Sequence, residues 1–265
     1  MRRSYIPFLP FLVGVYAFLY LPIASLVLFS FNEGLSLSKW QGFSLAWYGK
    51  LFRDFHLYEA LWNSLKVAGL SATMSVLLGF LCALVSVRKT RVLYLDVLSS
   101  TPLVLPEVLI GLSFLIFFVT SEFLFGFPQG RGLGTISVAH TTVSLAYTTL
   151  VLRSRLLEAD KNLEEAALDL GASPLHVFIS VTLPFLRPAL LAGWFLAFTL
   201  SLDDLVIASF SSGPSSVTLP VMIFSRVKMG LTPEINALCS LIVLFVFLCA
   251  PLASAWFYLS FKRRG

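Results

Sequence analysis

The sequence predicts an all-α membrane protein in which six transmembrane helices form a single domain over residues 1–265. The first observation is composition: 57% of the residues are hydrophobic and 12% are charged, whereas soluble domains carry about 25% charged residues. The second is that the apolar residues gather in six long stretches. The third is that the basic residues lie in short clusters between these stretches, and not in a continuous stripe of the kind that binds nucleic acid.

Each apolar stretch is long enough to be a membrane-spanning helix, which needs about 20 apolar residues to cross about 30 Å of hydrocarbon. Four stretches contain no Asp, Glu, Lys or Arg, and two are interrupted by carboxylates or prolines. Helices are the expected spanning element because backbone polar groups must be satisfied internally in lipid. The predicted spans are residues 6–31, 67–87, 97–120, 132–152, 188–210 and 235–261.

The basic residues also predict an orientation, because the side richer in Lys and Arg is normally cytoplasmic. Twelve of the 19 basic residues lie on the side that holds both termini. We therefore expect both termini in the cytoplasm. The first apolar stretch is longer than the core of a signal peptide and contains Pro7, Pro10 and Pro22, so we interpret it as an uncleaved helix.

No motif of an enzyme is present. The sequence contains no G-x-x-x-x-G-K-[ST], H-E-x-x-H, C-x-x-C or G-x-S-x-G pattern. Its three cysteines lie inside apolar stretches without the spacing of metal ligands, and we interpret them as small hydrophobic residues. We expect no catalytic residue, no metal site and no cofactor on this chain.

The longest hydrophilic segment of the predicted cytoplasmic side is residues 153–187. We expect it to form two helices separated by a turn. Gly171 is suited to end the first helix in the left-handed conformation, and Ser173 and Pro174 are suited to begin the second as N-cap and first residue. The first helix is expected to carry an apolar stripe formed by Leu156, Leu163, Ala167 and Leu170.

This segment resembles the EAA loop of ABC-importer permeases. The resemblance consists of Glu165-Ala166-Ala167, then Gly171, then Leu183-Pro184 at fixed spacing between the fourth and fifth spans. It implies that these residues form a coupling helix that fits into a groove on a separate cytoplasmic ATPase. An ordinary amphipathic loop helix is the alternative.

A broader resemblance covers nearly the whole chain. WQGFSLAWYGKLF, NSLKVAGLSAT and FTLSLDDLVIASFSSGP are similar to segments of spermidine/putrescine importer permeases, and most similar to the C-type subunit. Leu105-Pro106-Glu107 stands where these relatives often have Ser-Pro-Asp, so the carboxylate is retained. The resemblance implies a type I ABC importer permease fold in the bacterial inner membrane. It also implies as partners a second permease subunit, two copies of an ATPase that binds ATP and Mg²⁺, and a periplasmic solute-binding protein.

Three carboxylates, Glu107, Asp203 and Asp204, lie within predicted spans that contain no Lys or Arg. Charged residues inside a span usually face a cavity or a partner, so these carboxylates favour a cationic substrate such as a polyamine. We expect one of the two adjacent aspartates to meet the substrate and the other to brace the local backbone. Pairing with a basic residue of another subunit, or a neutral carboxyl group, is the alternative.

Two further residues complete the predicted substrate pathway. Ser201 lies close to the aspartates and can form a hydrogen bond there, although serine in a helix often bonds its own backbone. Trp47 is a candidate for a cation–π contact with an amine, and membership of an interfacial aromatic belt is the alternative. We interpret His140, within the fourth predicted span, as a packed neutral histidine.

Other functions remain as alternatives. An ABC permease for another small solute would keep the same loop, whereas an ion-coupled secondary transporter or channel would have no use for it. An intramembrane enzyme would need a nucleophile or metal-binding set that the sequence does not show.

Overall fold

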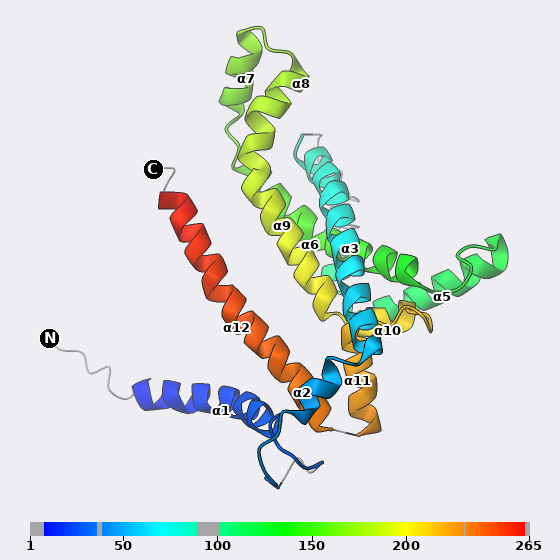
Figure 1. The fold of residues 1–265 in the computed structure, drawn as a ribbon. Helices are drawn as coiled ribbons and strands as arrows, with labels where there is room; N and C mark the ends of the chain where they lie inside the picture. The colour runs from blue at the N-terminus through cyan, green and yellow to red at the C-terminus, as the bar shows by residue number, and fades with distance from the viewer. Residues whose placement is uncertain (1–7, 36–38, 89–100, 231, 263–265) are drawn as a thin grey trace, which may run out of the picture. The chain divides into compact units, whose positions relative to one another are not determined.

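The computed structural model describes residues 8–35, 39–88, 101–230 and 232–262, and these residues are helical apart from loops and one isolated bridge between Asn32 and Phe43 (Figure 1). The helices are α1 (Phe8–Phe29), α2 (Ala46–Leu51), α3 (Phe55–Arg88), η1 (Thr101–Leu103), α5 (Glu107–Phe125), α6 (Leu133–Leu157), α7 (Lys161–Asp169), α8 (Pro174–Val177), η2 (Phe178–Thr182), α9 (Leu183–Asp203), α10 (Val206–Ser211), α11 (Leu219–Met229) and α12 (Pro233–Lys262). The all-α class is confirmed.

Five of the helical segments in the described residues are long and apolar enough to cross a membrane. They are residues 10–29, 55–88, 107–125, 133–157 and 174–203. The sixth predicted span corresponds to α12, which has 30 residues and an apolar portion at Pro233–Leu248. The order of helices therefore agrees with six spans.

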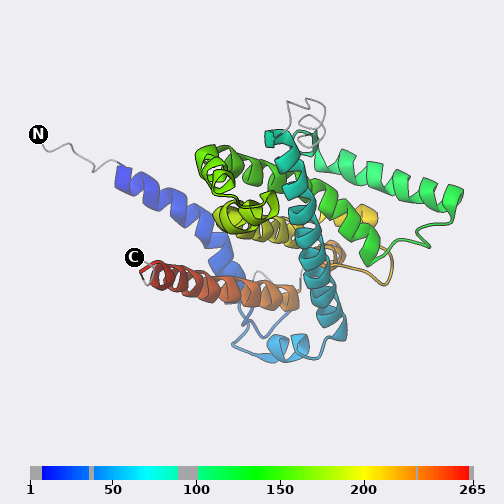
Figure 2. The same ribbon diagram turned by 90° about the horizontal axis from the view of Figure 1, so that it is seen from above.

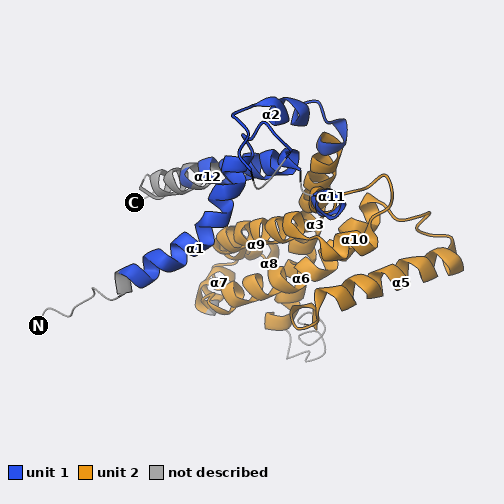
Figure 3. Ribbon diagram, turned by 90° about the horizontal axis from the view of Figure 1, so that it is seen from below, with its two compact units in different colours: residues 1–57, 223–265 blue, residues 58–222 orange. Residues whose placement is uncertain are grey.

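The chain divides into two compact units (Figure 3). Unit 1 comprises residues 1–57 and 223–265, and unit 2 comprises residues 58–222. The single permease domain over residues 1–265 stays a prediction.

Two helices begin or end where local chemistry interrupts the predicted spans. The third span was predicted from residue 97, of which residues 97–100 lie outside the described residues, and α5 begins at Glu107, directly after Pro106. Proline suits this position because it lacks the backbone N–H that a helix start leaves unpaired. The fifth span was predicted to continue to residue 210, but α9 ends at Asp203 and the chain is extended at Asp204 (φ −68°, ψ 120°).

Small residues on one stripe of α3 bring the helices of unit 2 into close contact. Ala68, Ala72 and Ala83 are fully buried on this stripe. A Cβ atom at Gly79 would lie 2.5 Å from Oγ1 of Thr148 on α6, so only glycine allows this approach. Transmembrane helices associate through such small residues because lipid gives no hydrophobic drive for large ones.

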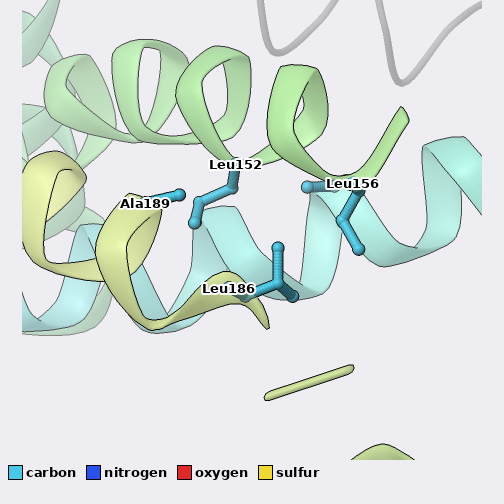
Figure 4. Close-up of a cluster of buried hydrophobic side chains, with 5 residues drawn as sticks. Leu152, Leu156, Leu186 and Ala189 are labelled. Carbon is cyan, nitrogen blue, oxygen red and sulfur yellow. The ribbon is translucent and has the colours of Figure 1, made fainter. Parts of the chain in front are cut away.

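Helices α6 and α9 pack side by side (Figure 2). Near the end of the pair that adjoins α7, Leu152, Leu156, Leu186 and Ala189 point toward one another beside Ala83 (Figure 4). Leu156 is therefore a core residue of α6. The prediction that Leu156 shares a stripe with Leu163 was wrong, because α6 continues to Leu157 and α7 is a separate helix.

Helix α10 packs between α5 and α6. Ile207 is 1% exposed and lies in a cluster with Ile110, Phe118 and Ala139. Gly111 is pressed against Phe210, whose Cδ2 would lie 2.5 Å from an added Cβ. These contacts fix the position of the chain that follows Asp204.

In unit 1, α12 packs against both α1 and α2. An ion-pair cluster at one end joins the guanidinium of Arg226 to the carboxylates of Asp54 and Glu234. Burial raises the pKa of Asp54. The hydrogen bond and positive charge of Arg226, together with two backbone N–H donors, lower the pKa by more than burial raises it, so the pKa of Asp54 lies below its usual value.

Candidate functional site

The break between α9 and α10 consists of Asp204 and Leu205, and we call it the α9–α10 break. One carboxylate oxygen of Asp204, Oδ1, accepts a hydrogen bond of 3.1 Å from the backbone N–H of Ala208 in the first turn of α10. This bond satisfies a donor that every helix start leaves unpaired. Asp204 thus terminates one helix and stabilises the beginning of the next.

A cluster of polar side chains lies directly behind this break. Ser201 is 7% exposed, and its Oγ lies 2.7 Å from Nδ1 of His140 and 3.1 Å from Oγ of Ser71. Nε2 of His140 lies 3.9 Å from Oδ1 of Asp204. We call Ser71, His140, Ser201 and Asp204 the buried polar cluster. It joins α3, α6 and α9 to the α9–α10 break.

The structure brings together some of the predicted pathway residues and separates others. Ser201 bonds His140 and Ser71, and it connects to Asp204 through the histidine ring. Asp203 is exposed, so its side chain takes a different direction from that of partly buried Asp204. Glu107 is also exposed and begins α5, where a carboxylate interacts favourably with the helix dipole.

Trp47 belongs to unit 1 and is 8% exposed. Its indole N–H donates a 2.8 Å hydrogen bond to the carbonyl of Asn32, and the ammonium of Lys50 lies 4.3 Å from its ring centre. One cation–π contact to this ring is therefore made within the chain itself.

An apolar pocket of about 430 Å³ opens between η1, α5 and α6. Phe114, Phe117 and Val143 contribute to its wall, with Ser113 and Thr142 as polar members. None of the predicted pathway residues lines this pocket, so it is distinct from the α9–α10 break.

At the opposite end of α9, the loop helices have the predicted turn. Asp160 caps α7 by accepting a 2.9 Å hydrogen bond from the N–H of Asn162. Gly171 follows with φ +85°, and Ser173 and Pro174 begin α8 as N-cap and first residue. The second helix is longer than expected, because α8 continues through the π-helical turn η2 into α9.

Some of the predicted coupling residues are exposed on the surface, and others lie at the beginning of α9. Glu165 and Ala166 are exposed on α7, while Leu183 and Pro184 begin α9 and are partly buried. The apolar side chains of Leu163, Leu170 and Leu175 are also exposed, by 61%, 89% and 68%. This group of residues on α7, α8 and the turn between them is therefore available to a partner.

Glu164 is a residue that the sequence analysis missed. Its carboxylate forms an ion pair of 2.9 Å with Arg88 at the end of α3 and accepts a 2.5 Å hydrogen bond from Thr182 in η2. We call Arg88, Glu164 and Thr182 the Glu164 cluster. Its position directly before Glu165 is the one sequence signal that could have pointed to it.

Comparisons with known proteins bear on the family and the fold of the chain. Residues 75–264 match the family described as binding-protein-dependent transport system inner membrane component. The chain is 47% identical over 231 residues to the putrescine transport system permease protein PotI of Escherichia coli K12, covering 86% of this chain and 82% of that one. It is 36% identical over 241 residues to the spermidine/putrescine transport system permease protein PotC of the same strain, covering 88% and 87%.

The fold is also that of solved importers. A chain of a bacterial ABC transporter involved in alginate import superposes with a TM-score of 0.71 at 17% identity, covering 95% of this chain and 94% of that chain. A chain of an amino acid ABC transporter gives a TM-score of 0.56 at 18% identity, covering 85% of this chain and all of that one. With the helical spans, the loop geometry and these matches, the chain belongs to the family of binding-protein-dependent transport system inner membrane components, the multi-pass permease subunits of ABC importers.

Proposed function

We propose that this chain is the permease subunit through which an ATP-driven importer moves polyamines such as putrescine or spermidine across the inner membrane. The observation that carries the proposal is the α9–α10 break, where two adjacent carboxylates interrupt an apolar helix. Among the described residues, neither Asp203 nor Glu107 forms an ion pair with a Lys or Arg. A multiply charged cation would supply the missing positive charge.

The substrate class receives independent support from the relatives. Permeases named for putrescine and for spermidine/putrescine transport are 47% and 36% identical to this chain over most of its length. The solved importers are too distant in sequence to bear on the substrate.

We propose further that the loop helix α7 docks onto a cytoplasmic ATPase that binds ATP and Mg²⁺. Its partners then comprise two ATPase copies, a second permease subunit and a periplasmic solute-binding protein, with both termini of this chain in the cytoplasm. The exposed apolar residues of α7 and α8 support this docking, because an unpartnered Leu170 at 89% exposure suits a groove on another protein.

The experiment that tests the substrate is ATP hydrolysis by the complete complex in nanodiscs with its binding protein. Putrescine or spermidine is expected to raise hydrolysis above the ligand-free rate, while sulfate and a neutral sugar leave it unchanged. A response to sulfate or sugar alone would show a permease for another solute. Transport by this chain alone, driven by an ion gradient, would show a secondary transporter.

Loss of the Glu164 cluster is expected to weaken the coupling of ATP hydrolysis to transport without abolishing it. Glu164→Ala removes the acceptor for both Arg88 and Thr182, so α7 is less firmly joined to α3 and η2. We expect roughly a threefold fall in substrate transported per ATP hydrolysed, since exposed ion pairs contribute about 1 kcal/mol or less. Glu164→Gln, which keeps an acceptor for Thr182, is expected to lose less.

The matched control is Glu158→Gln. Glu158 is 63% exposed and pairs only with Arg155, three residues before it, among the contacts seen in the described residues. It is expected to behave as the unmodified protein. Equal transport per ATP in Glu164→Ala and Glu158→Gln would contradict a coupling role for Glu164.

A further inference from the structure

The histidine of the buried polar cluster has one nitrogen with no hydrogen-bond partner in the described part of the chain. His140 is 3% exposed, and its Nε2 is buried without a bond although Nδ1 is bonded to Ser201. Buried polar atoms in proteins are nearly always paired, so an unpaired one calls for an explanation. Oδ1 of the Asp204 carboxylate lies 3.9 Å from Nε2.

The hydrogen bonds of the two serines allow two positions for the proton of the neutral histidine ring. A serine hydroxyl has a single hydrogen to donate. When Ser71 donates to Ser201, Ser201 donates to Nδ1 of His140, and the ring proton then lies on Nε2, facing Asp204. When Ser71 donates instead to the carbonyl of Ala68 at 3.3 Å, Ser201 can donate to Ser71 and accept from Nδ1–H. The neutral ring then presents the lone pair of Nε2 to the carboxylate, which is repulsive. The carboxylate therefore favours the arrangement with the proton on Nε2.

A short movement would make the missing bond. The separation of 3.9 Å exceeds a normal N–H···O distance by about 1 Å. Asp204 lies in the short extended break between two helices, where the backbone can rotate more easily than inside a helix. His140, in contrast, is held within α6 by its bond to Ser201 and by burial.

We propose that His140 is a positioning residue that donates its Nε2–H to Asp204 when the pathway is empty. This bond holds the complex in a resting state that hydrolyses ATP slowly, and the ammonium group of the cargo replaces the bond during passage. Both contacts use the ionised carboxylate, but only the ammonium group also carries a positive charge, so its contact with Asp204 is the stronger of the two. Ser71 and Ser201 hold the ring in the correct tautomer. The inference rests on the proposed function, since it needs a cationic cargo at Asp204.

The test uses two substitutions that each keep one of the two nitrogen positions. His140→Asn places a polar atom near the position of Nδ1 and removes Nε2, whereas His140→Gln reaches the position of Nε2 and gives up the bond to Ser201. In the complete complex without cargo, His140→Asn is expected to raise ATP hydrolysis roughly fivefold, which corresponds to one lost hydrogen bond. His140→Gln is expected to keep the rate of cargo-free ATP hydrolysis close to that of the unmodified complex.

A double-mutant cycle with Asp204→Asn tests the pair directly. Asp204→Asn keeps an acceptor oxygen but removes the charge that strengthens the contact with Nε2–H. In that background His140→Asn is therefore expected to add a smaller further increase than in the unmodified complex, because both changes weaken the same interaction. If His140→Asn does not assemble, Ser201→Ala provides the second variant and is expected to raise cargo-free hydrolysis by a smaller factor. The control is Thr149→Val, which removes another buried hydroxyl of α6 that lies outside the cluster.

The outcomes separate the two proposals. A polyamine response of the unmodified complex tests the proposed function and does not depend on His140. If that response is present, unchanged cargo-free hydrolysis in His140→Asn would overturn the positioning role. The role would also be overturned if the increase in cargo-free hydrolysis in the double variant equalled the product of the increases in His140→Asn and Asp204→Asn.

Discussion

Replacing Asp203 and Asp204 together by asparagine is expected to lower polyamine uptake at least tenfold while the complex still assembles. A cation that enters the apolar interior needs a countercharge, because a charge inside a span costs about 2.5–3.5 kcal/mol. Asparagine keeps an oxygen that can accept the N–H of Ala208, so the start of α10 retains its cap. Initial rates of radiolabelled putrescine uptake into proteoliposomes provide the measurement.

The matched control for this pair is Glu122→Gln. Glu122 lies near the end of α5, where its carboxylate accepts a hydrogen bond from the N–H of Gly130, and glutamine keeps that acceptor. The control removes a negative charge away from the α9–α10 break and is expected to leave uptake near the normal rate. Normal uptake in the Asp203/Asp204 double variant would remove both carboxylates from the pathway.

Gly171→Val is expected to abolish most of the ligand-stimulated ATP hydrolysis. Gly171 ends α7 with φ +85°, and its N–H and that of Ala172 bond the carbonyls of Leu168 and Ala167. A side chain at this position would have space, since nothing lies within 4 Å of an added Cβ. The cost is therefore in the backbone, about 1–2 kcal/mol for a left-handed residue, and the chain would relieve it by reorienting α7.

Two substitutions distinguish this backbone effect from a general effect of larger side chains. Gly171→Asn is expected to retain more coupling than valine, because asparagine adopts the left-handed conformation more readily. Gly69→Ala adds a methyl group to α3 where space is also open and φ is not left-handed, and it is expected to behave normally. Full stimulation in Gly171→Val would show that the turn does not transmit the ATPase cycle.

Much of this architecture could be predicted because it depends on local chemistry. Uninterrupted apolar length predicted the spanning helices, and the turn at Gly171 with its Ser173–Pro174 helix start followed from properties of those residues alone. The continuation of α8 through η2 into α9 could not be predicted, because a π-helical turn has no comparable local signature.

The candidate site was predicted only in part, because some of its contacts depend on how helices pack and not on local chemistry. Asp203 and Asp204 were conspicuous as carboxylates in an apolar stretch, but hydropathy did not reveal that the helix ends between them. His140 was interpreted as a packed neutral histidine, and its burial agrees with that interpretation. Its approach to Ser201, 61 residues away in sequence, depends on how α6 packs against α9, and no periodicity within one helix encodes that contact.

The most direct test of the account is photo-crosslinking from the loop helices in native membranes. A photoreactive phenylalanine analogue at Leu170, which is 89% exposed beside Gly171, is expected to crosslink to the ATPase subunit. The same analogue at Phe123, which is 86% exposed near the end of α5, serves as the control and is expected to give no such product. A crosslink to the ATPase from position 170 alone is the predicted result, and its absence in a complex that transports polyamine would contradict the coupling role of α7.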